Sequence, residues 1–223
     1  MPRRLRPTAP TAPDALLVGD PGRALLLAQE LLEQPKMSNH ARGLWGYHGS
    51  TPAGRALTIQ ATGIGGPSAA MVLGDLAELG VKRAVRVGTC VSFGGDCKAG
   101  NLLVVGEAIA AGGSGAAVGI EAGEAVRPDR ELSDRLLSEL DEVRTASTIV
   151  SVDTDPADAP PQPGAAAADM QTAPLLAKAR SLGVKVAAVL IVSECVGAEA
   201  LEKEVLENLE RRVGRAASAI LSS

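Results

Sequence analysis

The stretch that decides the fold is Leu17-Val18-Gly19-Asp20-Pro21-Gly22-Arg23-Ala24. The apolar residues 15–18 predict a short buried strand, and the apolar run after Arg23 predicts a helix over residues 24–32. Glycine lets the backbone approach a ligand, and a helix N-terminus presents unpaired N–H groups at the positive end of the helix dipole. With the Arg23 guanidinium beside it, this turn predicts a seat for an oxyanion such as phosphate. A purely structural Gly/Pro turn is the alternative.

Two further arginines lie in comparable places. Arg86 belongs to the stretch AVRVGTC (84–90), where an apolar strand runs into a Gly-Thr turn. Ligands of open α/β sheets collect at the carboxyl ends of strands, so Arg86 is a second candidate for binding an oxyanion. The alternative is a strand-end charge that reaches solvent. Arg42 lies in the stretch NHARGLWGY (39–47).

Composition limits the classes of protein to consider. The chain has 223 residues, a formal net charge of −4 and a pI near 5.3, which argues against nucleic acid or an anionic membrane as a partner. No apolar run reaches the length of a transmembrane helix. Residues 1–13 are rich in Pro and Thr and have no apolar signal segment, so they predict a flexible tail before a single domain at 14–223.

The sequence predicts neither a metal nor a nicotinamide cofactor. Cys90, Cys97 and Cys195 are odd in number and widely spaced, which fits a reduced cytoplasmic protein better than a disulfide framework or a zinc site. The glycine-rich segment GIGGPS (63–68) has Ser68 where a dinucleotide loop needs its third glycine.

Hydrophobic periodicity predicts alternating strands and helices, which is the pattern of an α/β domain. The core must be built from aliphatic residues, because only three aromatic residues are present. The Gly-rich stretch 110–123 and the Pro- and Ala-rich stretch 153–166 are predicted to be connections. The predicted strands are 15–18, 44–48, 56–62, 83–87, 102–109, 143–152 and 184–193, and the predicted helices are 24–32, 67–79, 128–140 and 201–221.

Four blocks in order, LVGDPGRA (17–24), NHARGLWGY (39–47), TGIGGPSAA (62–70) and RVGTC (86–90), resemble the hexameric purine nucleoside phosphorylase and uridine phosphorylase family. The resemblance covers residues 14–110, weakens to about residue 184 and returns in part in the last strand and helix. It implies a divergent member with a three-layer αβα domain around a twisted mixed sheet.

The implied activity is cleavage of the N-glycosidic bond of a purine-like or unusual nucleoside by phosphate, giving free base and pentose 1-phosphate. No cofactor is implied besides inorganic phosphate as co-substrate. The implied assembly is a cytoplasmic homo-oligomer, a hexamer built as a trimer of dimers.

The resemblance implies a complete phosphate site. Its residues are a backbone N–H of Gly19, the forked donors of Arg23 and Arg86, the hydroxyl of Thr89, and Arg42 from a neighbouring subunit. Arginine suits phosphate because its planar N–H donors can bind two oxygens at once. Arg86 is also a candidate catalytic residue, because phosphate must be held under the anomeric carbon while positive charge develops on the sugar.

The sugar and base sites depart from the family pattern. A Glu-Met-Glu motif is matched here by Asp169-Met170-Gln171, so Met170 is expected to pack on the sugar and Gln171 to bind its hydroxyls without a charge. An alanine-rich helix start is the alternative for this segment. Ser193-Glu194 stands where purine-specific members have Ser-Asp, which makes Glu194 the candidate acid for the departing base.

Cys90 and Val91 are the remaining candidates for nucleoside binding. Val91 replaces a family glycine and is expected to crowd the base, and the family's stacking aromatic is missing near residues 153–155. Two alternatives to a phosphorylase therefore stay open. One is a nucleoside hydrolase of the same superfamily, and the other is a catalytically weak protein that binds phosphate or a nucleotide. The accepted base is not determined.

Overall fold

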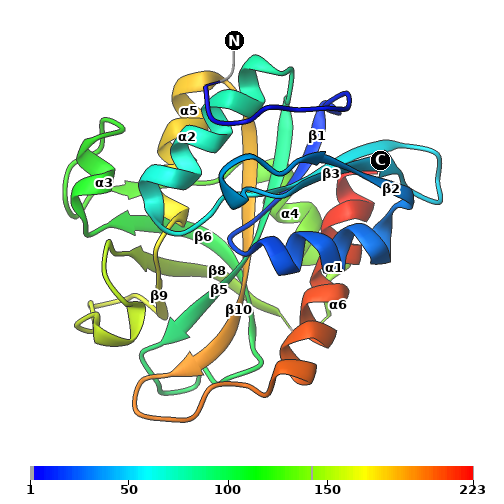
Figure 1. Cartoon of the computed structure of the whole chain (residues 1–223). Coiled ribbons are helices and arrows are strands. Elements are labelled where there is room, and N and C mark those ends of the chain that lie inside the picture. Colours follow the sequence, from blue (N-terminus) through cyan, green and yellow to red (C-terminus); the bar gives the residue numbers. More distant parts are fainter. Residues whose placement is uncertain (1–2, 142, 223) are drawn as a thin grey trace.

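The computed structural model describes residues 3–141 and 143–222 and shows a mixed β-sheet between two layers of helices (Figure 1). Two short 3₁₀ turns, η1 and η2, interrupt the longer connections. The elements are β1 (Asp14–Val18), α1 (Pro21–Leu31), β2 (Glu33–Asn39), η1 (Ala41–Gly43), β3 (Gly46–Ser50), β4 (Ala56–Ala61), α2 (Gly65–Glu78), β5 (Arg83–Ser92), β6 (Leu102–Ala110), α3 (Gly113–Ala116), β7 (Ala125–Val126), α4 (Arg130–Glu139), β8 (Val143–Ser151), η2 (Pro156–Asp158), β9 (Ala167–Asp169), α5 (Thr172–Leu182), β10 (Lys185–Cys195) and α6 (Lys203–Ser222).

The sheet closes on itself at one side. Its strand order is β2-β3-β4-β1-β5-β9-β8-β6-β10, and β10 also pairs with β5. β5 is therefore shared between an open sheet, with β1, β4, β3 and β2, and a ring, with β9, β8, β6 and β10. Both β1 and β10 run parallel to β5, so the carboxyl ends of these three strands lie at one edge of the sheet.

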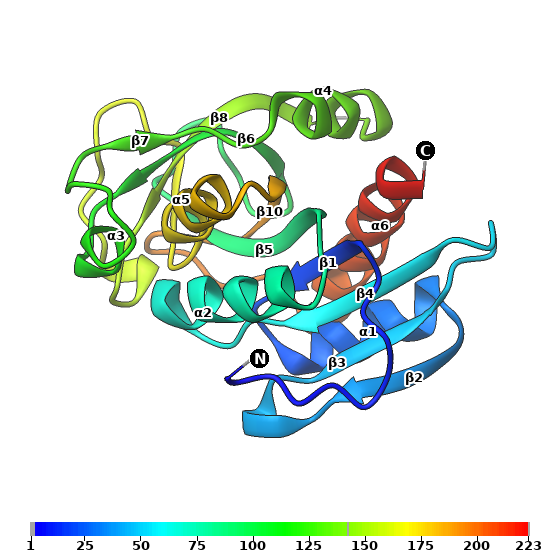
Figure 2. The same ribbon diagram turned by 90° about the horizontal axis from the view of Figure 1, so that it is seen from above.

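The helices cover the two faces of the sheet. Helices α2 and α5 lie together on one face, and α1 and α6 lie together on the other (Figure 2). Successive side chains of β1 point to opposite faces of the sheet. Leu17 packs in the core beneath α2 and α5, whereas Leu16 and Val18 pack beneath α1 and α6. The α/β class with a mixed central sheet is thus confirmed.

Most of the predicted elements are present. The predicted strands at 15–18, 102–109 and 143–152 match β1, β6 and β8 to within one residue. The two strands predicted around residue 50 form the antiparallel pair β3 and β4. Helices α1, α2, α4 and α6 match the four predicted helices to within three residues at each end.

The sequence did not predict β2, the short β9 or the extent of α5. Strand β2 lies at the edge of the sheet, contains Pro35 and has five exposed residues in a row, so it lacks the alternation of a half-buried strand. Its Gln34 has φ +48°, and the pairing with β3 shifts register there. The stretch 110–123, predicted as a connection, holds the short helix α3.

The sequence predicted a flexible tail before β1, but in the structure this segment is bound to the domain by burial and hydrogen bonds. Leu5 is buried, and its backbone N–H donates to Asp75 Oδ2 of α2 at 2.9 Å. The N–H of Arg6 donates to Asn39, and the N–H of Ala12 donates to Thr58. Burial raises the pKa of Asp75, but the N–H groups of this segment outweigh it and leave that pKa below its usual value.

Within residues 3–141 and 143–222, none of the helices combines the length and hydropathy that crossing a membrane requires.

Candidate functional site

A cavity of about 480 Å³ opens at the carboxyl ends of β1 and β5. The α1 N-terminus, the loop between β4 and α2, and the junction of β9 with α5 form its other walls. It also receives Pro156 and Ser193. Eight of the predicted site residues line it: Gly19, Arg23, Arg86, Thr89, Cys90, Val91, Met170 and Gln171.

The turn between β1 and α1 is built around Asp20. Its side chain caps the helix by accepting from the Arg23 backbone N–H at 2.8 Å, and Pro21 occupies the first turn, where no N–H is needed. A Cβ at Gly22 would lie 2.9 Å from Asp20 Oδ1, so the cap requires glycine there. This local chemistry fixes the backbone of Arg23 at the cavity wall.

The Arg23 side chain reaches across to α6. Its Nε donates to Glu210 Oε1 at 2.5 Å, and both side chains are more than nine-tenths buried. A long contact of 3.5 Å joins Nη1 to the carbonyl of Val87. The arginine is therefore held between the cavity and a buried carboxylate.

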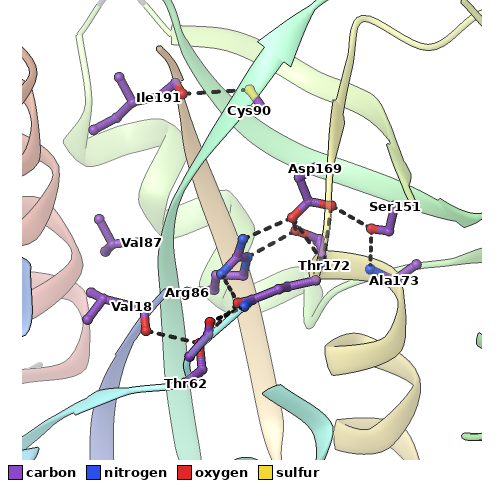
Figure 3. Close-up of polar contacts among 12 residues, drawn as sticks. Val18, Thr62, Arg86, Val87, Cys90, Ser151, Asp169, Thr172, Ala173 and Ile191 are labelled. Carbon is purple, nitrogen blue, oxygen red and sulfur yellow. Dashed lines mark hydrogen bonds and ion pairs between the residues drawn. The ribbon is translucent and has the colours of Figure 1, made fainter. Parts of the chain in front are cut away.

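Arg86 lies at the centre of the buried polar network drawn in Figure 3. Its Nη2 donates to Asp169 Oδ2 at 2.9 Å, its Nε to Thr172 Oγ1 at 3.1 Å and its Nη1 to Gln171 Oε1 at 2.7 Å. The side chain of Arg86 is 4% exposed. Burial lowers the pKa of Arg86, and the Asp169 carboxylate opposes that shift.

Asp169 is positioned by the start of α5. It accepts from the backbone N–H and hydroxyl of Thr172 and from the hydroxyl of Ser151, which in turn accepts from the N–H of Ala173 (Figure 3). A carboxylate with this many donors stays in place, and it holds the guanidinium of Arg86 in one orientation.

Gln171 bridges two walls of the cavity. Its Oε1 accepts from Arg86 and from Thr62 Oγ1, and its Nε2 donates to the carbonyl of Gly63. The residue is 3% exposed. A sugar hydroxyl at this point would have to share an amide that already has three partners in the chain.

The other lining residues shape the cavity. Thr89 and Met170 are partly exposed to it, whereas Cys90 and Val91 are buried at its wall. Burial raises the pKa of the Cys90 thiol well above its ordinary value, so this group is neutral at physiological pH. Val91 pairs with Ala168 of β9.

Two predicted site residues lie outside the cavity lining. Arg42 is exposed on η1, with φ +61°. Glu194 is partly exposed beyond a register shift between β10 and β5, and Ser193 lines the cavity in its place. The single chain therefore brings together most of the predicted phosphate site but not the predicted acid.

Sequence reasoning missed Glu210, Ser151 and Thr172. A signal existed for Glu210, because it follows Leu206 by four residues and precedes Val213 by three. It therefore places a charge on the apolar stripe of the last helix. Nothing in the sequence around Ser151 marks it, since only the fold brings β8 beside Asp169.

Each arginine at the cavity has a carboxylate partner within the chain. Arg23 and Arg86 face Glu210 and Asp169, and Asp20 adds an exposed carboxylate. Among the described residues, no cluster of three or more His, Cys, Asp and Glu side chains is arranged to hold a metal ion. The arrangement suits an oxyanion that uses the N–H groups these arginines leave open.

Comparison with known proteins identifies the superfamily to which this fold belongs. The sequence profile of the phosphorylase superfamily matches residues 13–223. The chain belongs to this superfamily. The fold of uridine phosphorylase from Vibrio fischeri ES114 superposes on it with a TM-score of 0.82 and 22% identity, over 95% of this chain and 92% of that one.

Curated relatives in the superfamily match a shorter segment. The DeoD-type purine nucleoside phosphorylase of Oceanobacillus iheyensis is 45% identical over 76 residues, or 34% of this chain and 32% of the relative. The DeoD-type enzyme of Clostridium novyi is 40% identical over 94 residues, or 42% of this chain and 40% of the relative. The similarity thus spans well under half of the length of these relatives.

Proposed function

We propose that this chain cleaves the N-glycosidic bond of a nucleoside with inorganic phosphate, giving free base and pentose 1-phosphate. The observation that carries the proposal is that Gly19, Arg23, Arg86 and Thr89 line the same cavity as Met170. Superfamily membership and the purine nucleoside phosphorylases among the relatives support it. A purine-like or unusual nucleoside is the proposed substrate.

The phosphate half of the cavity has donors to spare. A guanidinium carries five N–H groups, and Arg86 uses three of them on Asp169, Gln171 and Thr172. The remaining two, the Thr89 hydroxyl and the α1 N-terminus would hold phosphate beneath the sugar. Because the network fixes Arg86 in advance, the phosphate that it would hold is in place, with its negative charge, as the oxocarbenium-like transition state forms.

The sugar and base half is less charged. Met170 would pack on the sugar, and Gln171 would offer it only a neutral amide that already has partners. Val91 narrows the space for the base, and Glu194 would have to enter from outside the lining to protonate it. A nucleoside whose base is a good leaving group needs the least protonation and charge stabilisation from the residues of this half.

A second copy of the chain would complete the site. Arg23 and Arg86 are already paired with carboxylates, so a phosphate needs a further cation. Arg42 is exposed and has no ion-pair partner among the described residues. We propose that Arg42 of a neighbouring subunit supplies that charge, in a hexamer built as a trimer of dimers.

The deciding experiment assays a panel of purine and pyrimidine nucleosides with and without phosphate and follows the release of free base. Phosphate-dependent release is expected, and Thr89→Ala serves as a variant weakened at the phosphate. Release that is equal without phosphate would contradict the proposal, and so would no release from any nucleoside.

The shared site is tested by complementation. Arg42→Ala and Arg86→Ala are each expected to be nearly inactive. When they are co-expressed, a mixed dimer has one site with both arginines intact, so activity should return. No recovery in a sample shown to contain mixed oligomers would place Arg42 outside the site.

Charge balance favours one second candidate, a nucleoside hydrolase. If no subunit adds a cation, the guanidinium groups of Arg23 and Arg86 face two carboxylates in the cavity lining and that of Glu210 behind it, which suits water better than a phosphate dianion. The same nucleoside panel separates the two functions, since a hydrolase releases base at the same rate without phosphate.

A further inference from the structure

Arg23 and Glu210 form a buried ion pair that uses little of the guanidinium. It joins the first turn of α1 to the middle of α6 through one N–H and one carboxylate oxygen, Nε and Oε1, at 2.5 Å. Both partners are buried. A pair that served only to hold the two helices together would be expected to use the fork of the guanidinium more fully.

The pair of Arg83 with Asp14 gives the contrast. There both carboxylate oxygens accept, at 2.7 and 2.8 Å, and the carbonyl of Leu221 accepts from the same guanidinium at 2.6 Å. Arg23 has only Glu210 and the distant carbonyl of Val87 as acceptors within the described part of the chain. Three of its five N–H groups therefore remain for a ligand.

Glu210 also has room to withdraw. A groove of about 490 Å³ between α1 and α6 is lined by Glu210, Arg23 and Asp20, on the side away from the main cavity. Arg23 and Asp20 line both hollows, so Arg23 is in contact with the main cavity and with this groove. Glu210 contacts Arg23 but does not line the main cavity, so it touches no bound substrate there.

An oxyanion in the cavity and the Glu210 carboxylate would draw on the same guanidinium. Two anions on one cation repel each other, and the low dielectric of a buried site strengthens that repulsion. We infer that Glu210 competes with phosphate for Arg23 and sets the phosphate affinity of the cavity, an inference that rests on the proposed phosphorolysis. Glu210 is a positioning residue, because it acts through Arg23.

The test compares Glu210→Gln with Glu204→Gln, which removes the same charge from an exposed position on the same helix. Phosphate is titrated into each protein by calorimetry, with no nucleoside present. Glu210→Gln should bind phosphate about tenfold more tightly than the wild type, and Glu204→Gln should bind it like the wild type. Equal or weaker binding by folded Glu210→Gln would overturn the inference.

Thermal unfolding separates competition from a purely structural role. Without phosphate, Glu210→Gln should unfold at a lower temperature than the wild type, because buried Arg23 has lost its counter-ion. Added phosphate should then raise its Tm more than it raises that of the wild type. A lower Tm that phosphate does not rescue would show that Glu210 only supports the fold.

If Glu210→Gln does not fold, Glu210→Asp replaces it. The shorter side chain keeps the charge but withdraws it from Nε, so phosphate affinity should rise about threefold. No rise would overturn the inference. Failure of the proposed function would give a different result: no nucleoside of the panel would release its base, although substitution of Glu210 would still change the phosphate affinity.

Discussion

Arg83 and Arg86 lie on the same strand, β5, and each is paired with an aspartate, yet their surroundings differ. Arg83 faces Asp14, its register partner on β1, at the amino end of the strands and with side chains 24% and 12% exposed. Arg86 faces Asp169 from the β9–α5 junction, with side chains 4% and 0% exposed. The hydrogen bonds of Asp14 raise the pKa of Arg83, whereas burial lowers that of Arg86.

The difference between the two pairs indicates that Arg86, rather than Arg83, is placed to bind a ligand in the cavity. Arg83 concentrates its donors on one carboxylate and a nearby carbonyl, so the contact is complete without any ligand. Arg86 divides its donors among Asp169, Gln171 and Thr172 and still lines the cavity. Burial with spare donors is costly, and a bound oxyanion would offset that cost.

The largest expected effect follows from removing Arg86. Arg86→Ala leaves Asp169 buried without its cation, so the free energy of unfolding should fall by about 3–5 kcal/mol. Phosphate affinity should fall by about a thousandfold, measured by calorimetry. Arg86→Lys keeps the charge and checks whether the forked geometry matters. Unchanged phosphate affinity in folded Arg86→Ala would show that Arg86, like Arg83, serves only the fold.

A smaller effect is expected at Gln171, the amide that joins Arg86 to the Gly63 carbonyl. Gln171→Glu places a negative charge where one would stabilise the developing charge on the sugar, so phosphorolysis should rise by about ten- to a hundredfold. Initial rates on a nucleoside that the wild type accepts measure the effect. Gln171→Met is the control, since it has similar size without polar atoms. A Glu variant slower than the wild type would mean that the amide serves the loop and not the sugar.

Arg83 should give the smallest effect. Arg83→Ala removes a partly exposed pair, so we expect a loss of about 1 kcal/mol in unfolding free energy and no change in phosphate affinity. Urea unfolding and the same calorimetric titration measure both. A fall in phosphate affinity would break the distinction between the two ends of β5.

Much of the fold could be predicted from local patterns. The Gly-Asp-Pro-Gly turn marks where β1 ends and α1 begins, and the apolar residues spaced four apart from Leu201 to Leu221 predict α6. The ring could not be predicted, because β9 is three residues long and its alanines carry no alternation. Its pairing with β5 and β8 depends on contacts between distant parts of the chain.

The candidate site likewise has residues that local sequence patterns could identify and residues that only the tertiary structure shows. Arg86 was singled out by its place before Gly88 and Thr89, and Thr89 by the family resemblance, and both line the cavity. The Gly-Thr turn predicted after residue 87 was wrong, because β5 continues through Gly88 and Thr89 to Ser92. The position of Glu194 was not predictable, since the register shift after Val192 leaves Ser193 at the lining. Asp169 was assigned to a motif, but its role as the partner of Arg86 needed the tertiary structure.

The sharing of β5 between the open sheet and the ring has a consequence for synthesis on the ribosome. β5 is complete at Ser92, and β1 is already available to pair with it. β9, which begins at Ala167, extends the edge occupied by β1 at Val91 and Ser92, whereas the opposite edge is covered only by β10, which begins at Lys185. At about 5–20 residues per second, that edge of an apolar strand stays open for roughly 5–20 seconds. Nascent chains stalled before residue 185 are therefore the species most exposed to aggregation and most dependent on chaperones.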